Sequence, residues 1–261
     1  MIPAIGIMVP TLGNRPEYLI ECLNSIRHAG DAFVLLVAPE DFDPSQYLDA
    51  GLVNQSVKDP GLGLAGAINA GIQAFPEEVL LVNWLGDDDL LSPNSLEVAS
   101  AFLLNHPDVD LVFGSCDYID TTGSKVWTNK SGQWAVPLLR FGPDMIPQPG
   151  ALFRRSFFNR VGRANPDFGL AFDFELLIRM SKVGRLKFLN KTLASFRWHP
   201  ESLSVEQRKK SVMDASRSRV AHLPAFLRFF SFLWEIPVRQ ATLWAGNRVT
   251  TRARRLSKVN I

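Results

Sequence analysis

Residues 80–93, LLVNWLGDDDLLSP, are the stretch that decides the fold. An apolar run of this length predicts a buried strand, and here the run stops at three consecutive carboxylates. Ser92 and Pro93 then suggest the N-cap and first residue of a helix. Three like charges at one strand end repel each other, unless a hard divalent cation such as Mg²⁺ or Mn²⁺ takes their oxygens as ligands. A polar turn with solvated charges is the alternative.

Length and composition are those of an ordinary globular protein. The chain has 261 residues, 46% of them hydrophobic and 21% charged, which favours one α/β domain with an appendage. The two cysteines have no ligand-like spacing, and so few of them suggest a reducing, cytoplasmic location. Residues 4–9 are apolar without a basic flank, so no signal peptide is predicted, and no 18-residue apolar stretch predicts a membrane-spanning helix.

Charge is unevenly distributed along the chain. Residues 1–204 carry 16 Lys+Arg and 23 Asp+Glu, whereas residues 205–261 carry 12 and 3. We therefore divide the chain into a catalytic body, residues 1–204, and a basic helical extension, residues 205–261. The division is consistent with an enzyme held near an anionic surface, and no nucleic-acid partner is expected.

Predicted strands and helices alternate through the body. This alternation predicts a mostly parallel sheet with helices on both faces, and ligands of such sheets bind beyond the carboxyl ends of the strands. The predicted strands are residues 4–9, 33–37, 53–57, 79–85, 110–114 and 194–198, and the predicted helices are residues 16–28, 64–74, 93–105 and 172–182. After residue 205 the pattern is helical, with breaks expected at Pro224 and Pro237.

The GLGLAG sequence at residues 61–66 matches a dinucleotide-binding fingerprint, and Asp87 follows at nearly the spacing of a ribose-binding acid. Pro60 lies where the preceding strand should enter the turn, and a ribose needs one carboxylate rather than three. We therefore favour a glycine-rich turn packed on the sheet. An NAD(P)-dependent oxidoreductase remains the alternative.

Two further positions are candidates for catalysis. Asp173 and Glu175 lie in the first turn of a predicted helix, where acids either complement the helix dipole or act as a general base. His199 follows a predicted strand, a place suited to a metal or phosphate ligand, although a lone histidine is more often structural.

In chain order, several segments resemble motifs of the family 2 glycosyltransferases, which have the GT-A fold. The match covers about residues 4–204 in the family's order. The matching segments are residues 10–16 and 19–26, LAGAINAG at 64–71, GDDD at 86–89, residues 148–155 and 161–162, DFELLIR at 173–179 and RWHPESLS at 197–204.

The resemblance implies roles for individual residues. Asp87 is expected to contact the ribose, Asp88 to support this site, and Asp89 to hold Mn²⁺ or Mg²⁺ against the donor diphosphate with the help of His199. Asp173 is expected to deprotonate the acceptor hydroxyl. The donor-binding set also includes residues of the opening motif and of the segment before the metal motif, namely Thr11, Arg15 and Asn69.

One departure concerns the nucleotide. The family's Asp-Gly-Ser after the second strand is absent, and Glu40, Asp41 or Asp59 are the candidates to replace its aspartate. The resemblance implies a metal-dependent inverting transfer from a nucleotide-diphosphate sugar to a carbohydrate or lipid-linked acceptor, in surface polysaccharide or glycan assembly. A catalytically inactive binding subunit of the same fold is a second alternative.

The extension contains an aromatic stretch, FLRFFSFLW at residues 226–234, followed by basic residues. The stretch is too short and too interrupted by charge to span a bilayer. Aromatic anchors beside basic residues suit a helix lying in the headgroup region of an anionic membrane. Packing on the body or on a second copy, as a homodimer, is equally compatible. The basic residues are Arg239, Arg248, Arg252, Arg254, Arg255 and Lys258.

Overall fold

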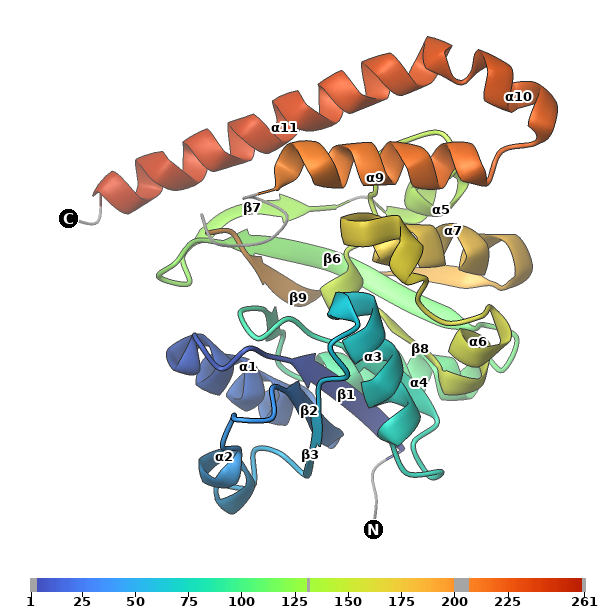
Figure 1. The fold of residues 1–261 in the computed structure, drawn as a ribbon. Coiled ribbons are helices and arrows are strands. Elements are labelled where there is room, and N and C mark those ends of the chain that lie inside the picture. Colours follow the sequence, from blue (N-terminus) through green and yellow to red (C-terminus); the bar gives the residue numbers. More distant parts are fainter. Residues whose placement is uncertain (1–3, 131, 200–206, 260–261) are drawn as a thin grey trace.

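A single mixed sheet forms the centre of the protein, with helices on both of its faces (Figure 1). The computed structural model describes residues 4–130, 132–199 and 207–259. The predicted boundary between residues 204 and 205, most of the closing motif after His199, and the side chains of Arg254, Arg255 and Lys258 lie outside the described residues.

The strand order of the sheet is β3-β2-β1-β4-β8-β6-β9-β5, and β7 pairs with β6. The strands are β1 (Ile5–Pro10), β2 (Phe33–Ala38), β3 (Gln55–Lys58), β4 (Leu81–Trp84), β5 (Leu90–Leu91), β6 (Leu111–Ile119), β7 (Lys125–Asn129), β8 (Leu152–Arg154) and β9 (Leu186–Arg197). Each strand predicted from the sequence is present, with bounds shifted by a few residues; the predicted strand at 53–57 is β3, and that at 194–198 is the end of the longer β9.

Most of the strand pairing is parallel. Strands β3, β2, β1 and β4 run parallel to one another, as do β6 and β9, while the short strands β8, β5 and β7 are antiparallel to their neighbours. The carboxyl ends of β1, β2, β3, β4, β6 and β9 therefore meet at one edge of the sheet, as expected for a ligand site.

Two apolar clusters cover the two faces of the sheet, because side chains of a strand point alternately to opposite sides. Ile7 and Val9 of β1 pack with the buried side chains of α1 (Pro16–Ala29) and α4 (Ser95–Asn105). Met8, between them, packs with α3 (Gly63–Ala74), α6 (Arg155–Arg160) and α7 (Phe172–Val183). The predicted mostly parallel sheet with helices on both faces is thus present.

The remaining helices are short or belong to the extension. They are α2 (Ser45–Asp49), α5 (Ala135–Leu138), α9 (Arg208–Ala221), α10 (Ala225–Phe230) and α11 (Phe232–Val259), with 3-10 helices η1 (Gly132–Trp134), η2 (Gln148–Gly150) and η3 (Pro166–Ala171). Helix α9 packs on η3 and α7, and α11 packs across α9 (Figure 1). Within the described residues, no helix is both long and apolar enough to cross a membrane.

Two predictions about prolines were wrong. Ser92 and Pro93 do not begin the helix: α4 begins at Ser95, and Asn94 at its N-cap has a positive φ of 58°, a left-handed conformation that asparagine tolerates. Pro237 does not break the chain but lies inside α11. It lies in the second turn, where its missing N–H costs the one hydrogen bond that the Leu233 carbonyl would accept, and the helix continues through it. The break predicted at Pro224 is present, because α9 ends at Ala221 and α10 begins directly after Pro224.

Candidate active site

The carboxylate triplet follows β4 at the carboxyl edge of the sheet. Asp87 and Asp89 are buried, with 4% and 5% of their surface exposed. A Cβ atom on the preceding Gly86 would lie 2.9 Å from an oxygen of Asp88 and 3.1 Å from one of Asp89. Glycine at this position therefore lets the chain turn tightly enough to direct all three carboxylates back to the strand ends.

Residues at the end of β1 hold the first two carboxylates. The Thr11 hydroxyl donates to Asp87 at 2.7 Å. The Arg15 guanidinium bridges the pair, with one nitrogen 2.6 Å from Asp87 and the other 2.7 Å from Asp88. Four residues predicted for donor binding, far apart in sequence, are thus brought together by the parallel pairing of β1 and β4.

Residues at the end of β9 hold the second and third carboxylates. The His199 Nε2 atom lies 2.7 Å from Asp88 and 3.1 Å from Arg15. The backbone N–H of Arg197 donates to Asp89 at 3.0 Å, and its buried guanidinium donates to the Asp88 carbonyl and to Glu21. The predicted metal residues Asp89 and His199 therefore lie in one cluster, with Arg197 locking the turn.

The three carboxylates differ in their electrostatic surroundings. Burial raises the pKa of Asp87, although the Thr11 hydrogen bond and the Arg15 charge partly offset it. Burial also acts to raise the pKa of Asp88, but the His199 hydrogen bond and the Arg15 charge outweigh it and hold that pKa below its ordinary value. Burial and the neighbouring charge of Asp88 raise the pKa of Asp89 well above its ordinary value.

A cleft of about 300 Å³ extends from this cluster to Asp173, the predicted base. Asp89 and Asp173 both line it, although they come from opposite sides of the sheet's carboxyl edge. The cleft is also lined by Tyr118, Asp144, Gln148, Trp198, Ser211 and Ala215. The last two belong to α9, so the extension forms part of the cleft wall.

Asp173 and Asp144 form a pair of acids in this cleft. Burial raises the pKa of Asp173 to about 6, partly offset by the backbone N–H of Phe174, which donates to its carboxylate at 2.7 Å. Burial and the charge of Asp173 raise the pKa of Asp144 well above its ordinary value. Asp144 was missed in the sequence because it is a single acid in an irregular segment, without a motif around it.

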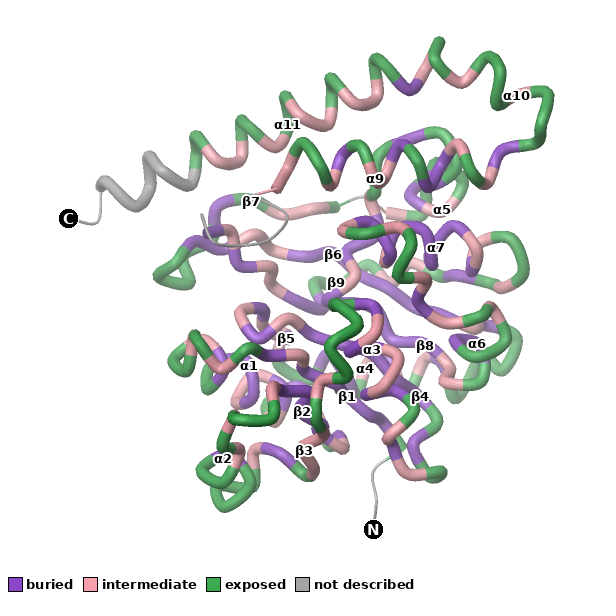
Figure 2. Tube along the Cα trace, in the orientation of Figure 1, coloured by how far each residue is buried: buried purple, intermediate pink, exposed green. Residues whose placement is uncertain are grey.

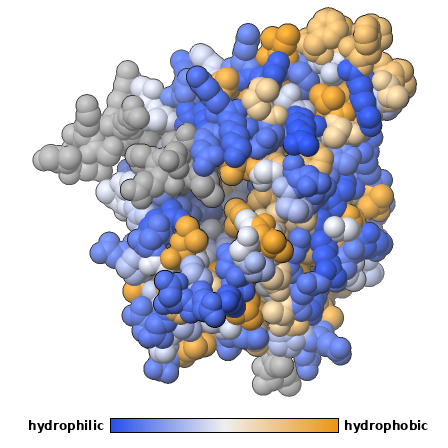
Figure 3. Space-filling model, in the orientation of Figure 1, coloured by the Kyte–Doolittle hydropathy of each residue, from blue (hydrophilic) through white to orange (hydrophobic). Residues whose placement is uncertain are grey.

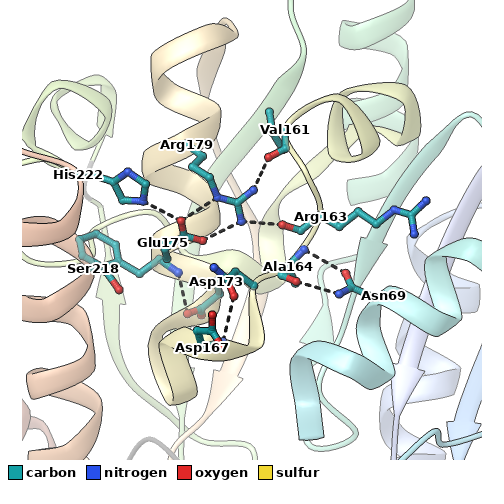
Figure 4. Close-up of polar contacts among 12 residues, drawn as sticks. Asn69, Val161, Arg163, Ala164, Asp167, Asp173, Glu175, Arg179, Ser218 and His222 are labelled. Carbon is teal, nitrogen blue, oxygen red and sulfur yellow. Dashed lines mark hydrogen bonds and ion pairs between the residues drawn. The ribbon is translucent and has the colours of Figure 1, made fainter. Parts of the chain in front are cut away.

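Glu175, the other acid of this turn, has a different environment (Figure 4). It is buried, forms a two-pronged ion pair with Arg179, and lies 2.7 Å from His222. Arg179 also donates to the carbonyls of Val161 and Arg163. Glu175 thus fixes α7 to the loop before η3 and to α9, whereas Asp173 is left facing the cleft.

Gln148, the first residue of the matching segment at residues 148–155, joins the cleft to β4. Its side-chain amide donates to the Asn83 side chain at 2.9 Å and to the Trp84 carbonyl at 2.8 Å. Asn83, a buried polar residue in an apolar strand, in turn donates to the Pro149 carbonyl. These hydrogen bonds fix one cleft wall relative to the strand that carries the triplet.

A second hollow, of about 390 Å³, lies at the start of α1. Arg15, Tyr18, Thr121 and His199 line it, and Arg15 and His199 connect it to the triplet through Asp87 and Asp88. The Arg197 guanidinium lies 4.4 Å from the centre of the Tyr18 ring and supports this wall.

The remaining predicted donor-binding residues lie outside the cluster. Glu40 follows β2 and Asp59 follows β3; Glu40 forms an exposed ion pair with Lys58, and Asp59 accepts the backbone N–H of Gly61. Asn69 on α3 exchanges two hydrogen bonds with the backbone of Ala164, at 2.8 and 3.0 Å (Figure 4). In this structure its amide therefore joins α3 to the loop before η3.

The GLGLAG turn has its own structural explanation. Gly61 and Gly63 have φ angles of 70° and 72°, which favour glycine, and a Cβ on either would meet nothing within 4 Å. A Cβ on Gly66 would lie 2.5 Å from Leu62 of the same turn. These glycines are required by the turn itself rather than by close helix–strand packing, so the oxidoreductase alternative is not favoured.

The residues at the triplet fit a divalent cation. Asp89 offers a carboxylate at the cleft wall, the kind of ligand that Mn²⁺ and Mg²⁺ prefer, and His199 offers an imidazole nitrogen, which in this structure lies 2.7 Å from Asp88. Among the described residues, no group of three or more His, Cys, Asp or Glu side chains is arranged to hold a metal. Mg²⁺ sites that use one or two carboxylates and complete the shell with substrate phosphates and water have this character.

Sequence comparison relates the chain to glycosyltransferases at a distance. A PGL/p-HBAD biosynthesis glycosyltransferase of Mycobacterium bovis is 28% identical over 186 residues, which are 68% of this chain and 69% of that protein. An uncharacterized glycosyltransferase of Rickettsia felis is 27% identical over 150 residues, and an uncharacterized Sinorhizobium fredii protein is 25% identical over 220. The chain spans 24% of the length of each of the last two. No protein-family profile matches.

Solved structures share the fold. A mannosyltransferase from Pyrobaculum calidifontis, in complex with GDP-Man and Mn²⁺, matches the whole chain and 80% of its own with a TM-score of 0.62 at 17% identity. S. aureus TarS in complex with UDP-GlcNAc matches 87% of this chain and 69% of its own with a TM-score of 0.61 at 14% identity. The protein therefore has a GT-A-like glycosyltransferase fold and is similar in sequence to glycosyltransferases.

Proposed function

We propose that the protein is a metal-dependent, inverting glycosyltransferase that moves a sugar from a nucleotide-diphosphate donor to an acceptor hydroxyl. The observation that carries the proposal is the cleft lined by both Asp89 and Asp173. One end offers ligands for a cation and a diphosphate, and the other offers a carboxylate whose pKa of about 6 suits a general base at neutral pH.

The donor is proposed to bind at the carboxyl ends of β1 to β4. Asp87, oriented by Thr11, accepts hydrogen bonds from the ribose, and Arg15 and Asp88 support it. Glu40 and Asp59 lie at the neighbouring strand ends, where they are candidates to contact the base. Asn69 supports this edge indirectly, because its hydrogen bonds to Ala164 hold α3 in place.

Asp89 and His199 are proposed to hold Mn²⁺ or Mg²⁺ against the donor diphosphate. The cation supplies positive charge that stabilises the departing diphosphate. The Mn²⁺ found with GDP-Man in the Pyrobaculum mannosyltransferase supports this assignment.

At the other end of the cleft, the Asp173 carboxylate takes the proton of the acceptor hydroxyl. The acceptor oxygen forms a bond to the anomeric carbon from the face opposite the nucleotide, as the bond from that carbon to the diphosphate oxygen breaks. The configuration at the carbon inverts, and the nucleoside diphosphate leaves with the electron pair.

The acceptor is proposed to be a carbohydrate or a lipid-linked glycan, in surface polysaccharide or glycan assembly. The mycobacterial relative named for PGL/p-HBAD biosynthesis supports an acceptor of this class.

Calorimetric titration with UDP and GDP, with and without Mn²⁺, tests the proposal first. We expect micromolar binding of one nucleotide that depends on Mn²⁺ and is lost in Asp89→Ala, because a hard ligand is removed and the diphosphate charge is left uncompensated. Glu97→Ala, an acid on the exposed side of α4, is the control and should bind normally.

Transfer is then measured with a panel of nucleotide sugars and acceptors. Nucleotide binding without any turnover would indicate an inactive binding subunit instead. Metal-independent binding of NAD, with no binding of a nucleoside diphosphate, would contradict the proposal outright.

A further inference from the structure

Helices α10 and α11 carry an apolar surface that the rest of the described chain does not cover (Figure 2). Seven of the twenty large hydrophobic side chains that are exposed in the described residues lie in this short stretch. We call them the C-terminal apolar patch: Phe226, Phe229, Phe230, Phe232, Leu233, Ile236 and Trp244. Orange and tan side chains gather at this corner of the molecule in Figure 3.

Exposure on this scale is costly in water. Phe226 and Phe229 are 71% and 77% exposed, and removing a phenylalanine side chain from water is favourable. Exposed apolar patches of this kind mark interaction surfaces. Four of the seven residues are phenylalanine and one is tryptophan, residues that suit the interfacial zone of a bilayer.

Helix geometry places part of the patch on one stripe of α11. Leu233, Ile236 and Trp244 are exposed and recur at helical spacing, and Arg248 and Arg252 continue the same side toward the C-terminus. The Arg248 guanidinium lies 4.5 Å from the centre of the Trp244 ring. The opposite side of α11 is engaged with α9, as the buried Glu235–Arg219 ion pair shows.

Charge on this surface has one sign. Between Arg208 and Arg252, all described by the structure, the two acidic residues are turned inward: Glu235 is buried against Arg219, and Asp214 accepts the backbone N–H of Leu170. The exposed basic residues of α10 and α11 in this range are Arg228, Arg248 and Arg252, and Lys209, Lys210 and Arg217 are exposed on the neighbouring α9.

From these observations we infer that the outer surface of α10 and α11 docks on an anionic lipid bilayer. The phenylalanines and Trp244 enter the interface between headgroups and acyl chains, and the arginines pair with the lipid phosphates. A second copy of the chain fits the surface less well, because a two-fold contact through this patch would place its arginines near one another without a carboxylate to pair with.

The inferred orientation has a consequence for the cleft. Ser211 and Ala215 of α9 line the cleft beside Asp173, and α11 packs on α9. Docking by α11 would therefore place the acceptor side of the cleft next to the bilayer, where a lipid-linked acceptor resides. This consequence rests on the proposed function, whereas the docking itself does not.

Vesicle co-sedimentation of the full chain, without donor or metal, tests the inference. We expect binding to phosphatidylcholine vesicles that contain phosphatidylglycerol, and about a tenfold or greater loss of affinity in the double variant Phe226→Ser/Phe229→Ser. Arg248→Gln/Arg252→Gln should lose about fivefold for each arginine, and the loss should disappear at high salt.

A matched control comes from the opposite side of the protein. Leu104→Ser on α4 removes a side chain that is 68% exposed and should leave vesicle binding unchanged. Circular dichroism melting checks that all variants fold. The inference is overturned if the wild-type protein does not bind anionic vesicles, or if the patch variants bind as the wild type does. It is also overturned if sedimentation velocity shows a dimer that the patch variants dissociate while vesicle binding persists.

Because the assay needs no sugar transfer, its failure and a failure of the proposed function can be told apart. A protein that binds vesicles but no nucleotide would retain the docking surface and lose the proposed enzyme activity. One that transfers sugar but does not bind vesicles would show the reverse.

Discussion

At the residue scale, the two acids at the start of α7 show how neighbours in sequence can differ in chemistry. Asp173 and Glu175 are both first-turn acids and were equal candidates for a base by position alone. In the structure the Glu175 carboxylate is hydrogen-bonded to Arg179 and His222, and these contacts lower its pKa in spite of its burial. Asp173 faces the cleft, and its pKa is raised to about 6. A base needs access to its proton donor, and of these two acids only Asp173 lines the cleft.

Replacing Asp173 by Asn should therefore leave donor binding nearly intact while lowering turnover. The amide keeps the shape but cannot accept the proton, and general-base catalysis typically contributes about 10²–10⁴-fold. Steady-state kinetics and calorimetric nucleotide binding are the measurements, with Asp167→Asn on the nearby η3 as the control. Unchanged turnover in Asp173→Asn would mean that another group accepts the proton.

The raised pKa of Asp173 also sets a pH dependence. Its carboxylate form exists mainly above pH 6, so kcat/KM should fall about tenfold per pH unit below that value. In the folded state this pKa lies above the ordinary value of 3.8, so the ionised group costs stability above pH 6 and costs none below about pH 4.

Asp173→Asn should accordingly be more stable than the wild type by about 1–3 kcal/mol at pH 8, and equal to it at pH 4. Urea unfolding at the two pH values measures the difference. Equal stability at both would show that the group does not titrate near pH 6.

At the element scale, α3 lies very close to the sheet because of one glycine. A Cβ on Gly71 would lie 2.4 Å from the Cγ atom of Met8 and 2.8 Å from a methyl of Val37. The contact sets the distance between α3 and strands β1 and β2, and β1 leads directly to Thr11. The GLGLAG turn leads directly into this helix. The backbone conformation of the turn explains a glycine pattern that also resembles a dinucleotide-binding fingerprint.

Gly71→Ala should destabilise the fold by about 1–3 kcal/mol, because overpacking forces either Met8 or the helix to move. Gln73→Ala on the exposed side of α3 is the control and should change stability by less than about 0.5 kcal/mol. Urea denaturation measures both. Equal midpoints for the two variants would mean that α3 can shift without cost.

At the scale of the whole molecule, the extension is joined to the body through buried charge. Arg219 of α9 and Glu235 of α11 are 2% and 4% exposed and make two hydrogen bonds of 2.7 Å. Arg219 also donates to the Gly142 carbonyl and lies against the ring of Phe174, next to Asp173. The helices that carry the apolar patch are thus fixed to the cleft wall.

Glu235→Gln should lower stability by about 3–5 kcal/mol, because it leaves the Arg219 guanidinium buried without its counter-charge. The double variant Arg219→Met/Glu235→Leu should recover most of that loss, since no unpaired charge remains. Thermal unfolding of the three proteins measures both effects. A double variant as unstable as Glu235→Gln would show that packing rather than charge is responsible.

The sequence by itself determined the longer strands and helices of the body, because each has an apolar period that local patterns report. The short strands β5 and β8 and the short helices α2, α5 and α6 were not predicted. It also located the triplet, Asp173 and His199, since short acidic and histidine motifs at strand and helix ends are visible without coordinates. The common position of these strand ends was predictable too, because parallel strands bring their carboxyl ends to one edge of the sheet.

Only the tertiary structure decided which polar side chains face the cleft and which are held by hydrogen bonds within the fold. It engaged Asn69 with Ala164 and Glu175 with His222, placed Asp144 beside Asp173, and brought α9 to the cleft wall. In the structure α4 begins at Ser95 rather than at Pro93, and α11 continues through Pro237. Each of these outcomes depends on partners far away in the chain, and the hydrogen bonds and packing that they supply leave no periodic signal in the sequence.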